Sequence, residues 1–351
     1  MNRFPPEWSN LNVVLCHDWL TGMRGGERVL ETLCEGFPNA PIYTLFHNPK
    51  AISDTINNHK IWTSWLQAFP GIARRYRYLL PLFPSAIELM SAPPAQLLIS
   101  TSHCVAKGLR PKRGTRHLCY CFTPMRYAWL FYDDYFGHSA AKSLMAKLLL
   151  PALRRWDVAS SRRVDRFVAI SRHVQQRIRD FYQRDADVVY PPVDTRRWTP
   201  GPPAPDGAFD LIVSALVPYK RIDVAVQAYR QLGYPLKIAG GGSETDRLRR
   251  LAGPNIEFLG WQTDDAILQL YRSCRLLVFP GEEDFGLVPL EAQACGKPVV
   301  GYGRGGLLET VKSGVTGAFF KTQTPDALAK AVLSAAALRW EDLLGLGFDS
   351  V

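Results

Sequence analysis

The sequence predicts an α/β protein with two doubly wound, Rossmann-like domains that face a cleft. Short apolar runs alternate with helical segments in both halves of the chain, and a proline-rich stretch separates the two halves. Apolar strands separated by helices are typical of parallel sheets that helices cover on both faces. The length of 351 residues, with 47% hydrophobic residues, is sufficient for two such domains.

The first domain is predicted to span residues 1–190. A strand at 12–15 is followed by a glycine-rich loop, 21–26, and by a helix that begins at Glu27. Further apolar runs predict strands at 97–100, 117–120 and 166–170.

Residues 191–208 are predicted to form an extended linker, because six prolines and one glycine fall between Tyr190 and Pro205. The second domain, 209–351, repeats the alternation. Its predicted strands and its last helix cover 211–214, 236–239, 276–279, 299–300 and 325 to about 338.

Positive charge is concentrated in the first domain. Residues 1–190 contain 25 Lys and Arg against 14 Asp and Glu, whereas residues 191–351 contain 17 against 18. One-sided charge indicates a partner on that side, such as nucleic acid, an anionic membrane face or a phosphorylated acceptor. A generally basic proteome is the alternative. The aromatic, arginine and leucine residues between Trp65 and Phe83 fit a membrane interface as well as a helix packed on the core.

Several function classes receive no support. No apolar run approaches the roughly 18 residues of a membrane span, and the first ten residues lack a secretory apolar region. The seven cysteines contain no CxxC pair, and Cys119 and Cys121 flank a single tyrosine, which is a weak metal signal. Buried free thiols in a reducing cytosol are the expected state.

Two glutamates with seven residues between them carry the main functional signal. Glu283 follows an apolar run, and Glu291 precedes a Cys-Gly stop and another apolar run, which predicts strand, loop, helix and strand. Glu283 then lies in the loop and Glu291 inside the helix. Phe285, Gly286, Leu287 and Val288 would present amides at the helix N-terminus, where phosphate binds favourably. This order fits the hexose, diphosphate and ribose of a sugar nucleotide.

Other residues of the second domain fit the same ligand. Lys220 follows the first strand of that domain, where a lysine can act as a point charge for phosphate. Gly241 lies in a triple glycine that follows the next strand, and Trp261 is placed to border a nucleobase. A solvated basic turn, a sharp turn and a core indole are the respective structural alternatives.

The first domain offers weaker candidates. Gly22, Gly25 and Gly26 open the first helix and allow close backbone approach to a phosphate or sugar, although a packing turn is an alternative. The loop is neither GxGxxG nor a P-loop, so neither NAD nor ATP is indicated. His103 and Arg126 follow later strands and can orient a hydroxyl. His17 and Asp18 form a sequential pair whose side chains point to different faces.

Taken together, these motifs resemble the retaining GT-B glycosyltransferases of glycosyltransferase family 4. The segment EEDFGLVPLEAQACGKPVVGYGRGGLLETV (282–311) is similar to the E-x7-E block of the family, and TSHCVAKG and YCFTPMRYAW resemble its mannosyltransferase branch in O-antigen and exopolysaccharide synthesis. The resemblance implies that Glu283 and Lys220 act in catalysis.

The resemblance assigns the remaining roles. It implies sugar and diphosphate contacts from the amides of residues 285–288, a ribose contact from Glu291, and a donor cleft lined by Gly22, Gly25 and Gly26. It implies no metal and no cofactor, with GDP- or UDP-sugar as donor substrate.

The sequence departs from the family pattern at two positions. Ala215 stands where an arginine usually lies, and Phe122 stands where a histidine is usual. Arginine is a bidentate phosphate ligand, so its loss weakens stabilisation of the leaving group unless Arg221 substitutes. The C-terminal crossover helices are also expected to be shortened.

The expected function is therefore transfer of a hexose, with mannose as a candidate, to a glycan or lipid-linked glycan in polysaccharide biosynthesis. The expected location is cytoplasmic, with the basic first domain as the candidate contact to the inner membrane face. The alternatives are a catalytically weakened GT-B scaffold that partners an active transferase, a sugar-nucleotide epimerase, and a basic nucleic-acid-binding module. No nucleic-acid motif supports the last.

Overall fold

The structure is a computed structural model, and it describes residues 4–5, 8, 10–129, 140–202 and 208–336. The chain forms two compact units, residues 1–191 (unit 1) and 192–351 (unit 2). Each unit contains one sheet, and every ladder between its neighbouring strands is parallel.

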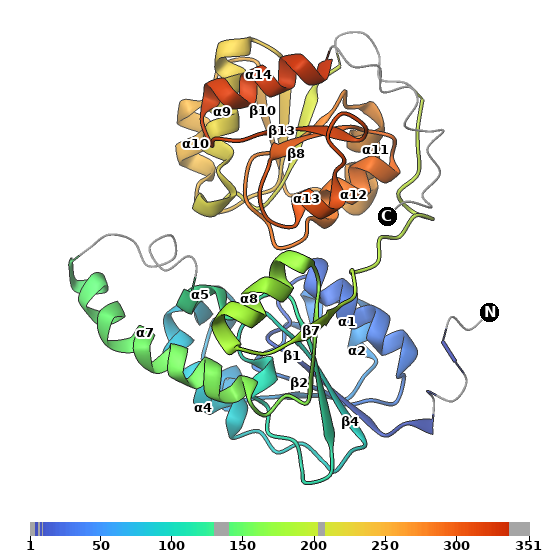
Figure 1. The fold of residues 1–351 in the computed structure, drawn as a ribbon, viewed down its shortest axis with the longest axis vertical. Helices are drawn as coiled ribbons and strands as arrows, with labels where there is room; N and C mark the ends of the chain where they lie inside the picture. The colour runs from blue at the N-terminus through green and yellow to red at the C-terminus, as the bar shows by residue number, and fades with distance from the viewer. Residues whose placement is uncertain (1–3, 6–7, 9, 130–139, 203–207, 337–351) are drawn as a thin grey trace. The chain divides into compact units, whose positions relative to one another are not determined.

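Unit 1 is built on a seven-stranded sheet in the order β3-β2-β1-β4-β5-β6-β7 (Figure 1). Its strands are β1 (Val13–His17), β2 (Ile42–Thr44), β3 (Ile61–Thr63), β4 (Leu97–Ser102), β5 (Arg116–Cys121), β6 (Arg166–Ala169) and β7 (Ala186–Val188). Its helices are α1 (Gly25–Gly36), α2 (Asp54–Asn57), α3 (Ile72–Arg75), α4 (Phe83–Glu88), α5 (Arg126–Trp129), α7 (Ala140–Ser161) and α8 (Arg172–Tyr182). Short 3-10 turns cover η2 (Pro49–Ala51), η3 (Trp65–Ala68), η4 (Tyr76–Leu82) and η5 (Ala106–Gly108).

Alternate residues of β1 enter different cores, because successive side chains of a strand point to opposite faces. Val13 and Leu15 pack in a core with residues of α1. Val14 and Cys16 pack in a second core with residues of α4 and α7. Figure 1 shows α1 and α2 on one side of this sheet and α4 and α7 on the other. The strand is therefore buried on both faces, which explains its uninterrupted apolar sequence.

Unit 2 is built on a six-stranded sheet in the order β10-β9-β8-β11-β12-β13. Its strands are β8 (Asp210–Val213), β9 (Leu236–Ala239), β10 (Ile256–Gly260), β11 (Leu277–Phe279), β12 (Val299–Tyr302) and β13 (Gly317–Phe320). Its helices are η6 (Pro218–Lys220), α9 (Ile222–Leu232), α10 (Thr245–Leu251), α11 (Asp264–Ser273), α12 (Leu287–Ala294), α13 (Leu307–Thr310) and α14 (Pro325–Ala336).

The sheet of unit 2 is also covered on both faces. Ile212 and Val278 share a core with residues of α9 and α14. Leu211 and Leu277 share the opposite core with residues of α11 and α12. The prediction of doubly wound parallel sheets is confirmed in both halves of the chain.

Every strand predicted from an apolar run is present, with ends that agree or differ by at most two residues. The strands without a prediction are short or lie toward the sheet edges: β2, β3, β7, β10 and β13. The predicted last helix corresponds to α14. The prediction that the C-terminal crossover helices are shortened concerns residues 337–351, which lie outside the described residues. The predicted linker is 191–208, and the two units divide between Pro191 and Pro192.

Two further expectations can be compared with the structure. All seven cysteines are free and buried, as predicted. Among the described residues, the helices are too short or too polar to cross a membrane. The stretch from Trp65 to Phe83 forms several short helical turns, η3, α3 and η4, and not one continuous amphipathic helix.

The strand order of each sheet indicates where a ligand site is expected. In a doubly wound sheet, ligands bind outside the carboxyl ends of the strands where the strand order reverses. In unit 1 that point lies between β1 and β4, and in unit 2 between β8 and β11. The loops that follow these four strands are 18–24, 103–105, 214–217 and 280–286.

A buried polar network joins three elements of unit 1. Asp157 of α7 accepts hydrogen bonds from Trp129 Nε1 and Tyr182 Oη, each at 2.8 Å, and forms an ion pair with Lys107. Lys107 Nζ also donates to the carbonyl of Cys104 at 3.0 Å. Asp157 and Lys107 are both buried. The network ties α5, α7 and α8 to the loop that follows β4.

We predict that Asp157→Ala lowers the free energy of unfolding of unit 1 by about 3–5 kcal/mol, because Lys107 is left as a buried, unpaired charge. Denaturant unfolding followed by circular dichroism measures the change. Asp187→Ala is the control, since it removes an ion pair whose two side chains are exposed, and we expect a loss below about 1 kcal/mol. Equal losses in the two variants would contradict the stabilising role of the network.

Candidate functional site

Lys220 and Glu283 form an ion pair at the reversal point of the unit 2 sheet. Lys220 ends η6 after β8, and Glu283 lies in the loop after β11, the strand next to β8. The two side chains are 17% and 14% exposed. An added Cβ at Gly281 would lie 2.9 Å from Cα of Lys220, so the two loops touch through their backbones. The structure thus brings together the two predicted catalytic side chains.

The loop from Glu283 to Gly286 is held by a second loop that follows β12. Gly306 N donates to Glu283 O at 2.8 Å, and an added Cβ at Gly306 would lie 2.4 Å from the carbonyl oxygen of Asp284. Gly305 has a φ of +70°, which favours glycine. These two glycines lie in the segment 282–311 that resembles the family, and the structure shows that they fix the position of the Glu283 loop.

Helix α12 begins at Leu287, with Gly286 as its N-cap at a φ of +96°. Phe285 is buried, and it anchors the loop immediately before the helix. The amides of the first helical turn are not used by bonds inside a helix and point out of its N-terminus. The amides of Leu287 and Val288 therefore follow Glu283 closely in sequence, and they lie at the end of a helix that favours anions.

Glu291 lies inside α12, one turn after Leu287. Tyr271 Oη of α11 donates to Glu291 Oε2 at 3.1 Å. Tyr271 is fully buried, and burial raises its pKa well above the ordinary value, so it remains a donor. This contact orients the carboxylate from 20 residues away in sequence. The sequence reasoning did not identify Tyr271.

The triple glycine after β9 contains two packed positions and one open position. An added Cβ at Gly240 would lie 1.9 Å from Ser214 O, and one at Gly242 would lie 2.2 Å from Leu216 O. An added Cβ at Gly241 would meet no heavy atom within 4 Å. The outer two glycines therefore bring the loops after β8 and β9 together, whereas the middle one presents bare backbone.

Three neighbouring residues need separate comment. The guanidinium of Arg221 donates hydrogen bonds to Asp223 at 3.2 Å and to Gln323 at 3.4 Å. The residue that the sequence offers as a substitute for an arginine at position 215 is therefore already bonded to other side chains. Ala215 is exposed. Trp261 is 80% exposed, so its core-packing alternative is wrong.

The glycine-rich loop of unit 1 is located at the carboxyl end of β1. An added Cβ at Gly22 would meet no heavy atom within 4 Å, whereas one at Gly26 would lie 3.3 Å from the Phe122 ring. Gly25 is the first residue of α1. The ring of Phe122 also lies edge-on to His17, with 6.4 Å between ring centroids. Phe122 therefore covers the start of α1 with an apolar ring.

Asp18 organises the loop that follows β4. Its carboxylate accepts hydrogen bonds from the amides of His103, Cys104, Val105 and Ala106 at 2.6–3.0 Å, and from His103 Nδ1 at 2.9 Å. Burial alone would raise its pKa, but His103 and the amides hold the pKa well below the usual range. Asp18 therefore stays ionised and fixes the His103 ring.

His17 turns away from this carboxylate, as the sequence predicted for a sequential pair. Its Nδ1 lies 2.7 Å from Thr101 Oγ1 and its Nε2 lies 3.9 Å from Glu27 Oε1. Burial lowers the pKa of His17 to about 4, so the imidazole is neutral at pH 7.

The predicted site residues form two sets, one in each unit. Lys220, Glu283 and the start of α12 share the unit 2 edge, and Gly26, His103 and Arg126 belong to loops or helix starts that follow neighbouring strands of unit 1. Arg126 begins α5, immediately after β5. Among the described residues, no group of three His, Cys, Asp or Glu side chains is arranged to hold a metal ion.

Two family models match consecutive parts of the chain. The model described as Glycosyltransferase Family 4 matches residues 23–197, and the model described as Glycosyl transferases group 1 matches residues 201–342. The two matches fall on units 1 and 2, respectively.

Curated relatives match part of the chain. A D-inositol 3-phosphate glycosyltransferase of Mycolicibacterium gilvum is 35% identical over 189 residues, which cover 47% of this chain and 43% of the relative. An uncharacterized glycosyltransferase of Methanocaldococcus jannaschii is 29% identical over 175 residues, covering 48% and 49%. The chain thus spans less than half the length of these relatives.

Solved structures share the fold over nearly the whole chain. Sucrose-phosphate synthase from Thermosynechococcus elongatus has a TM-score of 0.71 at 19% identity, covering 95% of this chain and 92% of that structure. Anabaena HepE, solved with UDP and glucose, has a TM-score of 0.68 at 18% identity, covering 93% and 90%. The solved structures show that the fold is GT-B. Because the two family models together match residues 23–197 and 201–342, the chain belongs to the glycosyltransferases that they describe, family 4 and group 1.

Proposed function

We propose that the chain transfers a hexose from a nucleoside diphosphate sugar to a hydroxyl group of a glycan or lipid-linked glycan. The observation that carries this proposal is the Lys220–Glu283 ion pair, placed at the reversal point of the unit 2 sheet and followed directly by α12. Cation, carboxylate and helix N-terminus together match a substrate that combines hydroxyl groups with a diphosphate.

Each group has a chemical role in the proposed reaction. Lys220 neutralises charge on the diphosphate as the bond between the anomeric carbon and the phosphate oxygen breaks. Glu283 accepts hydrogen bonds from sugar hydroxyls, the first amides of α12 bind the sugar and diphosphate, and Glu291 accepts from the ribose. The acceptor oxygen forms the new bond, and its proton passes to the leaving phosphate.

Donor entry requires a rearrangement of the ion pair. Lys220 and Glu283 neutralise each other in the structure, so the diphosphate must share Lys220 while a sugar hydroxyl contacts Glu283. The reaction is proposed to retain the anomeric configuration and to use no metal, in line with the family resemblance.

The substrates are proposed from chemistry and from relatives. UDP- and GDP-sugars are both candidate donors, and the UDP and glucose in Anabaena HepE support the former. Mannose remains a candidate hexose. The names of the matched D-inositol 3-phosphate glycosyltransferases make a phosphorylated polyol a further candidate acceptor, beside the glycans.

A catalytically weakened scaffold is the second candidate. It is favoured by the exposed Ala215, which stands where an arginine is usual in the family, and by the engagement of Arg221 with Asp223. A scaffold would bind the nucleotide sugar without releasing nucleotide.

We predict that Glu283→Ala lowers kcat/KM for nucleotide release by about a hundredfold or more, because a preorganised polar contact to the reacting sugar is lost. Release is measured with GDP-mannose and UDP-glucose across a panel of glycan acceptors. Glu257→Ala is the matched control, since Glu257 is an exposed carboxylate of the same unit. Turnover that is equal in wild type and Glu283→Ala would overturn the proposed role, and binding without turnover in wild type would favour the scaffold.

Gly240 and Gly241 provide a pair of adjacent substitutions with opposite expected effects. Gly240→Ala should destabilise unit 2 by about 2 kcal/mol or more, because its φ is +129° and the new Cβ would overlap Ser214 O. Gly241→Ala should change stability by less than about 0.5 kcal/mol but weaken binding of the nucleotide sugar. Thermal unfolding and calorimetric titration separate the effects. Wild-type affinity in Gly241→Ala would place the donor elsewhere.

We further propose that unit 1 contacts an anionic membrane face at the cytoplasmic side. Trp62, Trp65 and Phe69 are 45%, 42% and 41% exposed, and the Trp65 and Phe69 rings lie 5.9 Å apart. Lys60 Nζ lies 4.7 Å from the centroid of the Trp62 ring. Exposed aromatic side chains beside a cation suit the interface between headgroups and acyl chains.

For this membrane contact, we predict that Trp65→Ser with Phe69→Ser lowers binding to phosphatidylglycerol vesicles about tenfold or more, because apolar area is no longer buried in the interface. Co-sedimentation measures the binding. Trp261→Ser removes an exposed indole from unit 2 and is the control. If both variants sediment as the wild type does, the aromatic residues are not the contact.

A further inference from the structure

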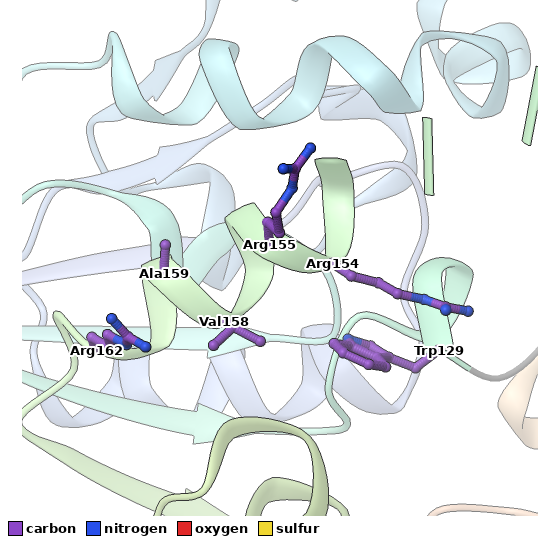
Figure 2. Close-up of a pocket in the computed structure, with 6 residues that line it drawn as sticks. All are labelled: Trp129, Arg154, Arg155, Val158, Ala159 and Arg162. Carbon is purple, nitrogen blue, oxygen red and sulfur yellow. The ribbon is translucent and has the colours of Figure 1, made fainter. Parts of the chain in front are cut away.

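A groove on the outer face of α7 combines three arginines with a small apolar floor. Its volume is about 330 Å³, and it is lined by Trp129, Arg154, Arg155, Val158, Ala159 and Arg162. Figure 2 shows Arg154 beside Trp129 at one end, Arg162 at the other end, and Val158 and Ala159 between them. A volume near 300 Å³ is sufficient for a small ligand.

The helix explains this arrangement. Residues 154, 158 and 162 are spaced by four, so they lie on one face, and 155, 159 and 162 follow the neighbouring row. Two turns separate the outer arginines, about 12 Å along the axis. Because Val158 and Ala159 are short, the long arginine side chains around them extend beyond the floor of the groove.

The aromatic wall of the groove is fixed before any ligand binds. Trp129 Nε1 donates to the buried Asp157, and the Trp129 ring stacks on Phe181 with 4.6 Å between centroids. Arg154 donates from Nε to the carbonyl of Ala128 at 2.8 Å, and its guanidinium carbon lies 5.3 Å from the centroid of the Trp129 ring. The hydrogen bond uses Arg154 Nε, and the ring contact holds the guanidinium group beside the tryptophan wall.

The charge of the groove is uncompensated by its own lining. None of the six lining residues is acidic. Within the described part of the chain, Arg154, Arg155 and Arg162 are in no ion pair, whereas some other arginines of unit 1 are paired, as Arg163 is with Glu88 and Arg166 with Asp187. Three guanidinium groups around one concave surface create a positive potential that attracts anions.

We propose that this groove binds a phosphate-bearing ligand with at least two negative charges, such as a diphosphate group. Guanidinium groups bind phosphate oxygens bidentately, and two arginine-bearing ends suit an elongated anion better than a single carboxylate. The groove lies entirely in unit 1, so the inference stands independently of the donor chemistry proposed for unit 2.

Inorganic pyrophosphate is the soluble probe. Its binding is measured by calorimetry in full-length protein that carries Lys220→Ala, so that the proposed donor site contributes nothing. We expect Arg155→Ala with Arg162→Ala to weaken binding about tenfold or more, because charge-assisted hydrogen bonds to phosphate are lost. Ala159→Glu, which places a carboxylate on the exposed floor, should weaken binding at least as much.

The matched control is Lys112→Ala with Arg113→Ala. These residues are exposed in the turn between β4 and β5 of the same unit, so the control removes the same net charge outside the groove. We expect a loss below about twofold. Similar losses in the two double variants, or no saturable binding by the parent protein, would overturn the proposal.

A second arm identifies the source of the phosphate. The same variants are compared in co-sedimentation with phosphatidic acid and phosphatidylcholine vesicles, because the phosphomonoester of phosphatidic acid can carry two negative charges. Selective loss of phosphatidic acid binding in the Arg155, Arg162 variant supports the site with a lipid headgroup as its ligand. Selective loss of pyrophosphate binding, with vesicle binding unchanged, supports the site with a soluble phosphate ester. Failure of nucleotide release in the donor experiments affects neither arm.

Discussion

The ion pair between Lys220 and Glu283 is the interaction on which the proposed chemistry depends. Both side chains are largely withdrawn from water, so either charge alone would carry a desolvation cost. Pairing offsets that cost. The proposed sugar nucleotide offers each member a replacement partner, phosphate for the lysine and hydroxyl groups for the glutamate. The pair can therefore stabilise the site by itself and also take part in the proposed recognition of the donor.

The sheet determines where this pair forms. Because β8 and β11 are parallel neighbours, their carboxyl ends meet at one edge, although 63 residues separate Lys220 from Glu283. Glycines then determine how closely the loops approach. Gly281 admits the backbone of Lys220, and Gly306 admits the backbone of Asp284. The charged residues carry the proposed chemistry, and small residues bring them close together.

The sequence predicts the part of this arrangement that depends on local pattern. Apolar runs such as 211–214 and 97–100 identify strands buried on both faces, and the spacing of Glu283 and Glu291 separates a loop residue from a helix residue. Strands such as β3 and β7 have three residues and partly exposed patterns, so they lack a periodic signal. The hydrogen bonds from backbone amides to the Asp18 carboxylate join residues that lie 85 to 88 positions apart in sequence. Such pairings follow only from the folded topology.

Phe122, which stands where the family usually has histidine, also shows what the sequence alone does not predict. From the sequence, Phe122 signifies only a lost hydrogen-bonding side chain. In the structure its ring packs beside Gly26 and His17, and the neutral His17 bonds to Thr101. The carboxyl edge of β1 is thus more apolar than a histidine at 122 would make it.

Packing also explains why the arginines on the outer face of α7 are not neutralised by Asp157 of the same helix. On an exposed helix, Asp157 would be placed to pair with Arg154, three residues before it. Here Asp157 faces the interior, where Lys107, Trp129 and Tyr182 use its carboxylate. Asp157, the carboxylate that could neutralise the outer face of α7, is therefore used inside the core. One buried carboxylate both fixes the tryptophan wall of the groove and leaves the arginine charges beside it to an external anion.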